Sequence, residues 1–138
     1  MPARYRIYQD EAFVYSEAYG DLRGEELLAH AKALAVDPAF SPSYAQLADF
    51  RAVVRFGPSP AEIRAHAAAN PFNSHAKRVA LVVTPLAFGT LRMYQLLTNT
   101  EDTVGLVTAI EAEAWAHVAR EPSVLSQLAQ SVWESTPI

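Results

Sequence analysis

The sequence contains no cysteine, and this absence excludes several classes of chemistry. Disulfide bonds, zinc–thiolate sites and thiol nucleophiles all depend on cysteine, so we expect none of them. A chain without cysteine also suits a reducing compartment, and we expect a cytoplasmic location. Glycine is scarce as well: none of the five glycines falls in a Gly-x-Gly-x-x-Gly or Walker pattern. The sequence therefore predicts no cofactor, and in particular no nucleotide held by a glycine-rich loop.

Long apolar runs and clustered basic residues are also missing. The longest apolar run, residues 79–83, is far shorter than the roughly 20 residues of a membrane-spanning helix. We expect no transmembrane segment, and the first residues lack the apolar core of a signal peptide. The 11 basic residues are scattered over a chain of net charge −4, and we interpret even the close pairs Arg4/Arg6 and Lys77/Arg78 as solvated surface charges. Because nucleic-acid binding needs a clustered positive surface, we expect no nucleic-acid partner.

The residues that are present have the composition of a folded domain. Hydrophobic residues make up 51% of the chain and charged residues 19%, which is typical of globular rather than disordered sequences. A chain of 138 residues suits one domain and is long enough to bury a core.

Hydrophobic periodicity divides the chain into strands and helices. Residues 4–9 alternate in polarity, residues 13–19 are rich in β-branched and aromatic side chains, and together they predict a β-hairpin that ends at Gly20. Asp37-Pro38 ends the helix that follows, because a residue before proline avoids the helical region. The remaining segments are predicted as strands at residues 44–50, 79–83 and 104–109 and as helices at residues 24–36, 60–70, 86–97, 110–118 and beyond Pro122.

This order is β-β-α-β-α-β-α-β-α, with an extra C-terminal helix. Strands that alternate with helices favour a mostly parallel sheet, here of five strands, in an α/β domain. The unbroken apolar run at residues 79–83 is typical of a strand covered on both faces. We expect one domain over residues 1–121 and an amphipathic helix over residues 122–138 that packs on it or on a partner.

Several short motifs accompany this order of elements. They are Gly20 followed by Glu25-Glu26-Leu27, Asp49-Phe50-Arg51, Lys77-Arg78-Val79-Ala80-Leu81-Val82-Val83, Gly89-x-x-Arg92-Met93-Tyr94 and Glu113-Ala114-Trp115. In these motifs and in the order of its elements, the sequence resembles the SpoIIAA-like family, which is grouped by fold with the STAS and Sec14/CRAL-TRIO domains. The resemblance extends from residue 4 to about residue 118 and implies a STAS-like fold and a non-enzymatic protein-interaction or regulatory module.

Two helix starts bear on this resemblance. Family members usually cap the first helix with threonine or serine, whereas Arg23 stands there and has no side-chain acceptor; Asp21 is an alternative cap. At the second helix, Ser59, Pro60 and Glu62 form the pattern of a capping box with proline at the first position. A serine near this place is phosphorylated in STAS regulators, so the resemblance also implies Ser59 as a phosphorylation site. Capping alone is the simpler interpretation.

Asp49, Arg51 and Arg92 form the candidate ligand-binding set. Asp49 and Arg51 lie at the end of a central strand, where open α/β sheets gather ligands, and Arg92 lies on the helix after the next strand. One interpretation is a structural ion pair between strand and helix; the other is an anionic ligand held by Arg51 and Arg92. A hydrophobic ligand is a further alternative to simple core packing for the aromatic and sulfur-containing side chains of Phe13, Tyr15, Phe88, Met93, Tyr94 and Trp115.

No motif predicts catalysis or metal binding. The chain has no Gly-x-Ser-x-Gly elbow, and its four histidines, His30, His66, His75 and His117, lie on different elements. None of them has the i, i+4 spacing of a helical zinc site, and the acidic pairs are adjacent residues that point apart. We therefore expect no enzyme and no metal.

The sequence leaves two functions open. The first is a STAS-like interaction or regulatory module, with the stripe of residues 124–132 in the last helix supporting a homodimer or another protein partner. The alternative is a carrier or sensor that binds a small apolar or anionic ligand in the cleft between sheet and helices.

Overall fold

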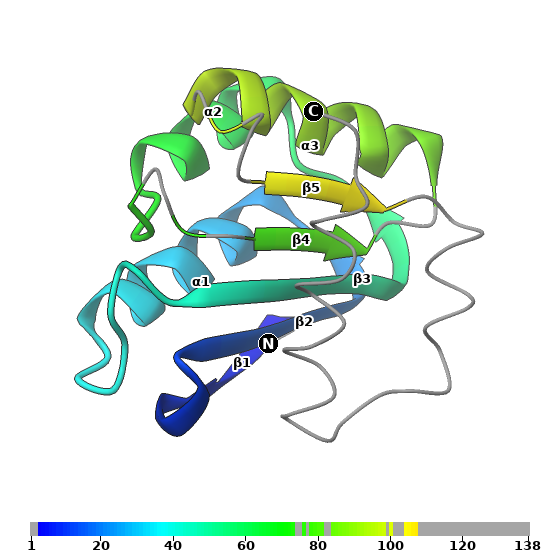
Figure 1. The fold of residues 1–138 in the computed structure, drawn as a ribbon. Helices are drawn as coiled ribbons and strands as arrows, with labels where there is room; N and C mark the ends of the chain where they lie inside the picture. The colour runs from blue at the N-terminus through cyan, green and yellow to red at the C-terminus, as the bar shows by residue number, and fades with distance from the viewer. Residues whose placement is uncertain are drawn as a thin grey trace.

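Five strands in the described part of the chain form one sheet, in the order β1-β2-β3-β4-β5 (Figure 1). The computed structural model describes residues 3–73, 76, 78–81, 84–98, 100 and 104–107. Strand β1 pairs antiparallel with β2, and each later strand pairs parallel with the one before it. The strands are β1 (Ala3–Tyr8), β2 (Phe13–Leu22), β3 (Ala45–Phe56), β4 (Arg78–Leu81) and β5 (Val104–Val107).

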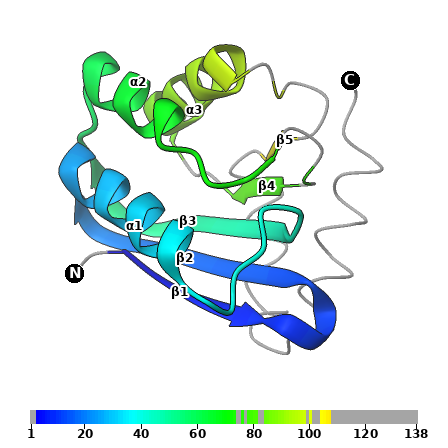
Figure 2. The same cartoon turned by 90° about the vertical axis from the view of Figure 1, so that its left-hand side faces the viewer.

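Three α-helices cover one face of this sheet (Figure 2). They are α1 (Gly24–Val36), α2 (Pro60–Ala68) and α3 (Pro85–Thr98), and a short 3-10 turn, η1 (Gln9–Glu11), connects β1 to β2. The prediction of an α/β fold is confirmed. The predicted helices at 110–118 and 122–138, and with them the division at residue 121, lie outside the described residues.

The hydrophobic stripes of the three helices meet the sheet in a common core. Leu27 of α1, Ile63 of α2 and Leu91 of α3 are buried and pack with Phe50 and Ala80 of the sheet. The residue types explain this arrangement, because a helix with apolar side chains on one stripe must bury them against another element. No helix in the described residues is long and apolar enough to cross a membrane.

Two strands run further than the sequence pattern predicts. Gly20 does not end β2; it lies inside the strand with a φ of 67°, a conformation that glycine adopts without strain. Its neighbour β3 extends to residue 56, and the register between the two strands shifts twice along this stretch. Each shift places an extra residue on β3, as in a β-bulge, and so breaks the period-two alternation from which strands are predicted.

The expected capping box at α2 is confirmed. The backbone N–H of Glu62 donates to Ser59 Oγ at 3.2 Å, and the backbone N–H of Ser59 donates to Glu62 Oε1 at 2.9 Å. At α1, Arg23 occupies the N-cap position without a side-chain capping bond. Glu26 partly replaces the cap, because its carboxylate accepts from the Arg23 backbone N–H at 3.3 Å.

Gly24 lets α1 approach α2 closely, and this contact gives a first prediction. A Cβ at Gly24 would overlap the Glu62 side chain, including its Cβ, so Glu62 would have to leave the capping box. We expect Gly24→Ala to lower the free energy of unfolding by about 1–3 kcal/mol in urea denaturation, as overpacking does. The matched control is Gly89→Ala in α3, where a Cβ meets nothing within 4 Å. That change should stabilise by about 0.5–1 kcal/mol, and equal effects of the two variants would contradict the prediction.

Candidate functional site

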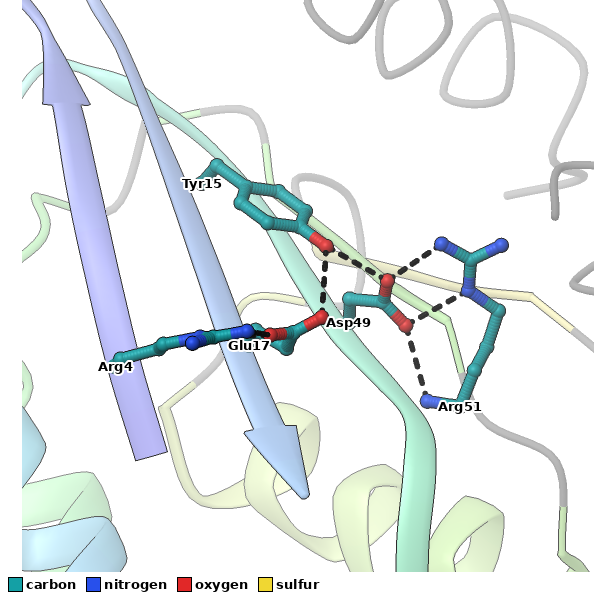
Figure 3. Close-up of polar contacts among 5 residues, drawn as sticks. All are labelled: Arg4, Tyr15, Glu17, Asp49 and Arg51. Carbon is teal, nitrogen blue, oxygen red and sulfur yellow. Dashed lines mark hydrogen bonds and ion pairs between the residues drawn. The ribbon is translucent and has the colours of Figure 1, made fainter. Parts of the chain in front are cut away.

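Asp49 and Arg51, two of the expected site residues, form an ion pair on β3 (Figure 3). The Arg51 guanidinium donates from Nη2 to Asp49 Oδ2 at 2.6 Å and from Nε to Oδ1 at 2.8 Å. The backbone N–H of Arg51 also donates to Oδ1, at 3.0 Å. Arg51 lies where the register of β2 and β3 shifts, so Asp49 satisfies an amide that the ladder between them leaves unpaired.

Further hydrogen bonds connect this ion pair across β2 to the edge strand β1. Tyr15 Oη donates to Asp49 Oδ2 at 2.9 Å and lies 3.5 Å from Glu17 Oε2. Glu17 in turn accepts from Arg4 Nε at 2.8 Å. Figure 3 shows these five side chains as one chain of alternating acceptors and donors over β1, β2 and β3.

The electrostatics of this network fit a structural role. Asp49 is only 3% exposed, and burial alone would raise its pKa, but the hydrogen bonds and charge of Arg51 outweigh burial and hold the pKa below its ordinary value. Burial, followed by the negative charge of Asp49, raises the pKa of Tyr15. Arg51 keeps its charge, because its hydrogen bond to Asp49 raises its pKa further. Both Asp49 oxygens are therefore engaged by donors from the protein.

The structure does not bring Arg92 to this pair. Arg92 is exposed on α3, and its Nη1 donates to Gln95 Oε1 at 2.9 Å. The reason is the alternation of side chains along a strand. Gln46, Ala48 and the other helix-facing residues of β3 border the space under α3, whereas Asp49 accepts from the Tyr15 hydroxyl, which also contacts Glu17, on the opposite face. The sheet itself separates Arg92 from Asp49 and Arg51.

The structure also places Ser59 and several of the aromatic side chains considered for an apolar pocket. Ser59 caps α2, as described above, and its phosphorylation stays a prediction. Of the side chains considered for an apolar pocket, Tyr94 borders a cavity, Phe13 is fully buried, and Phe88 is partly exposed. Trp115 lies outside the described residues.

A cavity of about 80 Å³ lies between the helix-facing side of the sheet and the three helices. Its walls are mostly apolar, but polar side chains reach it from both layers. Ser16, Gln46 and Arg78 come from three neighbouring strands. His30 comes from α1, His66 from α2 and Tyr94 from α3, so every helix contributes one polar side chain.

Arg78 is the only cation among the described residues that border this cavity. It is 7% exposed, its Nε donates to Gln46 Oε1 at 3.2 Å, and its Nη2 donates to Tyr94 Oη at 2.8 Å. The guanidinium also lies over the Phe72 ring, 4.3 Å from the centroid. Its Nη1 atom is buried without a hydrogen-bond partner, and no carboxylate of the described residues forms an ion pair with it.

Two histidines bring further unpartnered atoms to the cavity. His30 Nε2 and His66 Nδ1 are both buried and make no hydrogen bond. Burial lowers the pKa of His30 to about 4. The pKa of His66 is also lowered to about 4, mainly by burial and in smaller part by the positive charges of Arg78 and His30. Both imidazoles are therefore neutral at pH 7, and Arg78 supplies the single full charge among these six side chains.

Sequence reasoning missed this cluster. Arg78 was expected to be a solvated surface charge together with Lys77, and that expectation is wrong for Arg78. The alternation of side chains along a strand was a usable signal for the burial of Arg78. Arg78 lies two residues before Ala80 and therefore on the same face of β4, the face that the helices cover. The two histidines lie on different helices, and only the fold brings them to one cavity.

Comparison of the chain with protein-family models, with curated proteins and with solved structures finds no match. Within the described residues, no group of three or more histidine and acidic side chains is placed to hold a metal ion.

Proposed function

We propose that this domain binds a small anionic ligand in the cavity between the sheet and the helices, as a carrier or a sensor. The observation that carries the proposal is Arg78: a buried guanidinium that borders the cavity and whose Nη1 has neither a hydrogen-bond partner nor a counter-charge among the described residues. A negatively charged ligand would supply both the missing hydrogen-bond acceptor and the missing counter-charge.

The energetics support this interpretation. A buried charge costs several kcal/mol unless it is paired and hydrogen-bonded, so proteins rarely keep one without a reason. Gln46 and Tyr94 orient the guanidinium, yet both are neutral acceptors and leave its charge uncompensated. In the empty protein, the uncompensated charge of Arg78 lowers the free energy of unfolding. An anion that binds removes this cost, and so the bound state is favoured.

Binding alone is proposed, without catalysis. The cavity offers a cation, neutral imidazoles and hydroxyl groups, and these are sufficient to hold and orient an anion. The sheet order from β1 to β5 and the alternation with α1–α3 support membership of the SpoIIAA-like group, with a STAS-like fold, as a proposal that accompanies the function.

A protein-interaction module is the second candidate. Apolar side chains of α3 face solvent: Leu86 is 65% exposed and Leu96 53% exposed. Such side chains are common on interfaces, and a homodimer is the most frequent assembly. This candidate requires no ligand, so a single measurement of mass separates the two.

That measurement is native mass spectrometry of the gently purified full chain. We expect a bound small molecule whose extra mass survives dilution, disappears in Arg78→Met and persists in the exposed matched control Arg92→Met. An unliganded mass at one or two times the chain, together with no mass gained from added small anions, would overturn the ligand proposal and favour the interaction module.

The stability of Arg78→Met gives an independent readout. An arginine kept for structure leaves its partners unsatisfied when it is removed, which typically costs about 3–5 kcal/mol. An arginine kept for a ligand strains the empty protein, so its replacement by methionine should leave the free energy of unfolding of dialysed protein unchanged or higher. A large loss would identify Arg78 as a structural residue.

A further inference from the structure

We infer that the ligand is a short-chain monocarboxylate, with its carboxylate on Arg78 and its alkyl chain along the apolar walls of the cavity. This inference rests on the proposed function, because it names the class of anion for the same site. Three features of the cavity carry it: the sign and amount of charge, the arrangement of donors, and the size and polarity of the walls.

The charge of the site fits one negative charge. Arg78 is the only cation among the described residues that border the cavity, and each of the two histidines that border it has one buried ring nitrogen without a hydrogen-bond partner. Two acidic residues, Glu17 and Asp49, also border the cavity, but Arg4 and Arg51 neutralise them on the far face of the sheet. A monoanion therefore leaves the site neutral, whereas a dianion leaves one charge uncompensated in a medium of low dielectric constant.

The free donors fit a carboxylate. A guanidinium has five N–H groups, and Arg78 uses one from Nε and one from Nη2 toward Gln46 and Tyr94. Both N–H groups of Nη1 and one N–H group of Nη2 remain. The two N–H groups of Nη1 diverge, so a carboxylate in the guanidinium plane accepts from Nη1 through one oxygen, and such charge-assisted hydrogen bonds are about twice as strong as neutral ones.

The walls fit a short alkyl chain. At roughly 10–15 Å³ for each water-sized group, the cavity of about 80 Å³ holds about five to eight non-hydrogen atoms. The carboxylate takes three of these positions, so two to five carbons remain for the chain. The apolar walls that would contact it come from both layers and include Leu27, Ala31, Leu34, Phe50, Ala80 and Leu91.

The test is isothermal titration calorimetry of the dialysed full chain with sodium salts of acetate, propionate, butyrate and octanoate. Each buried methylene is worth about 0.8 kcal/mol, so affinity should rise about fourfold per carbon from acetate to butyrate and fall again at octanoate, which exceeds the cavity. Butyramide, which has the same shape without the charge, should bind at least tenfold more weakly than butyrate. Phosphate and sulfate should not bind measurably.

Two variants assign the binding to the cavity. Arg78→Met should weaken butyrate at least tenfold, whereas the matched control Arg92→Met on the outer surface should leave it unchanged. Tyr94→Phe removes only the hydroxyl that holds Arg78 Nη2 and should weaken butyrate severalfold while the far-UV circular dichroism stays the same. If Arg78→Met does not fold, two measurements on folded protein still test the proposal. They are the affinity of Tyr94→Phe for butyrate and the difference in wild-type affinity between butyrate and butyramide.

The failures of the two proposals are distinguishable. Phosphate or sulfate binding that depends on Arg78, without carboxylate binding, would overturn the monocarboxylate and leave the anion site in place. Carboxylate affinity that does not change with chain length, or that survives Arg78→Met, would also overturn it. If no anion binds and native protein carries no extra mass, both proposals fall together.

Discussion

Replacement of Asp49 by alanine should lower the free energy of unfolding by about 3–5 kcal/mol at pH 7, as removal of one partner of a buried ion pair does. Asp49 is almost fully buried and accepts hydrogen bonds from the side chain of Arg51, its backbone N–H and the hydroxyl of Tyr15. Alanine leaves all these donors without an acceptor and Arg51 without a counter-charge. The loss comes from the groups left behind, more than from the net value of the pair.

Urea denaturation at pH 7, with a double-mutant cycle over Asp49 and Arg51, measures this effect and its coupling. The matched control is Arg4→Ala in the same network, where the arginine side chain is 66% exposed and solvent screening leaves a much smaller expected loss. A loss at Asp49 no larger than that at Arg4 would show that the pair is not structural.

The effect of Asp49→Ala should also depend on pH, with a definite sign. The pKa of Asp49 is lower in the folded protein than in the unfolded chain, where it is about 3.9. The stability that its charge contributes is therefore complete well above pH 4 and is lost as the pH falls through the folded value. The difference between wild type and Asp49→Ala should shrink below pH 4.

Acidification from pH 7 to pH 4 should destabilise the wild-type protein through the two cavity histidines. Burial, the main cause, holds the pKa of both His30 and His66 at about 4 in the folded protein, against 6.5 for an ordinary imidazole. Between these values the unfolded chain binds protons that the folded chain does not. Stability is therefore complete above pH 6.5 and falls toward pH 4, by about 1 kcal/mol per pH unit for each imidazole.

Two measurements check this prediction. In NMR titrations of the folded protein, the His30 and His66 ring signals should keep their neutral shifts down to about pH 5. In urea denaturation, the double variant His30→Gln/His66→Gln should lose less stability than wild type between pH 6.5 and pH 5, a range where most carboxylates stay ionised. Ring signals that titrate near pH 6.5 would contradict the burial of these imidazoles.

Local sequence signals predict the helices of this fold better than its strand ends. Ser59 and Glu62 mark the start of α2 because a capping box is made by neighbouring residues, whose identity alone sets the geometry. The extension of β3 beyond residue 50 depends instead on how β2 pairs with it, and the two register shifts erase the alternation. Pairing between distant segments is a property of the fold and leaves little trace in either strand.

The same distinction between local and long-range signals applies to the residues of the candidate site. Asp49 and Arg51 are two residues apart on one strand, so their pairing is visible in the sequence. The partnership with Arg92 fails because it depends on which face of the sheet each side chain takes. The cavity cluster combines β2, β3, β4 and all three helices, and an isolated arginine at the start of a strand does not reveal the hydroxyl and imidazoles that meet it. Long-range placement assembles the candidate site, and the local sequence pattern does not encode it.

The order of the strands bears on how the protein is made. Each of the five described strands lies beside the one that precedes it in the chain, so none of these five has to insert between two earlier ones. The sheet can therefore grow from the N-terminal hairpin while the ribosome is still adding residues. Ser16 and Gln46 are in place once β3 has docked, but Arg78 arrives with β4 and Tyr94 only with α3. A nascent chain thus buries its cation last, after the layers that enclose it have begun to form.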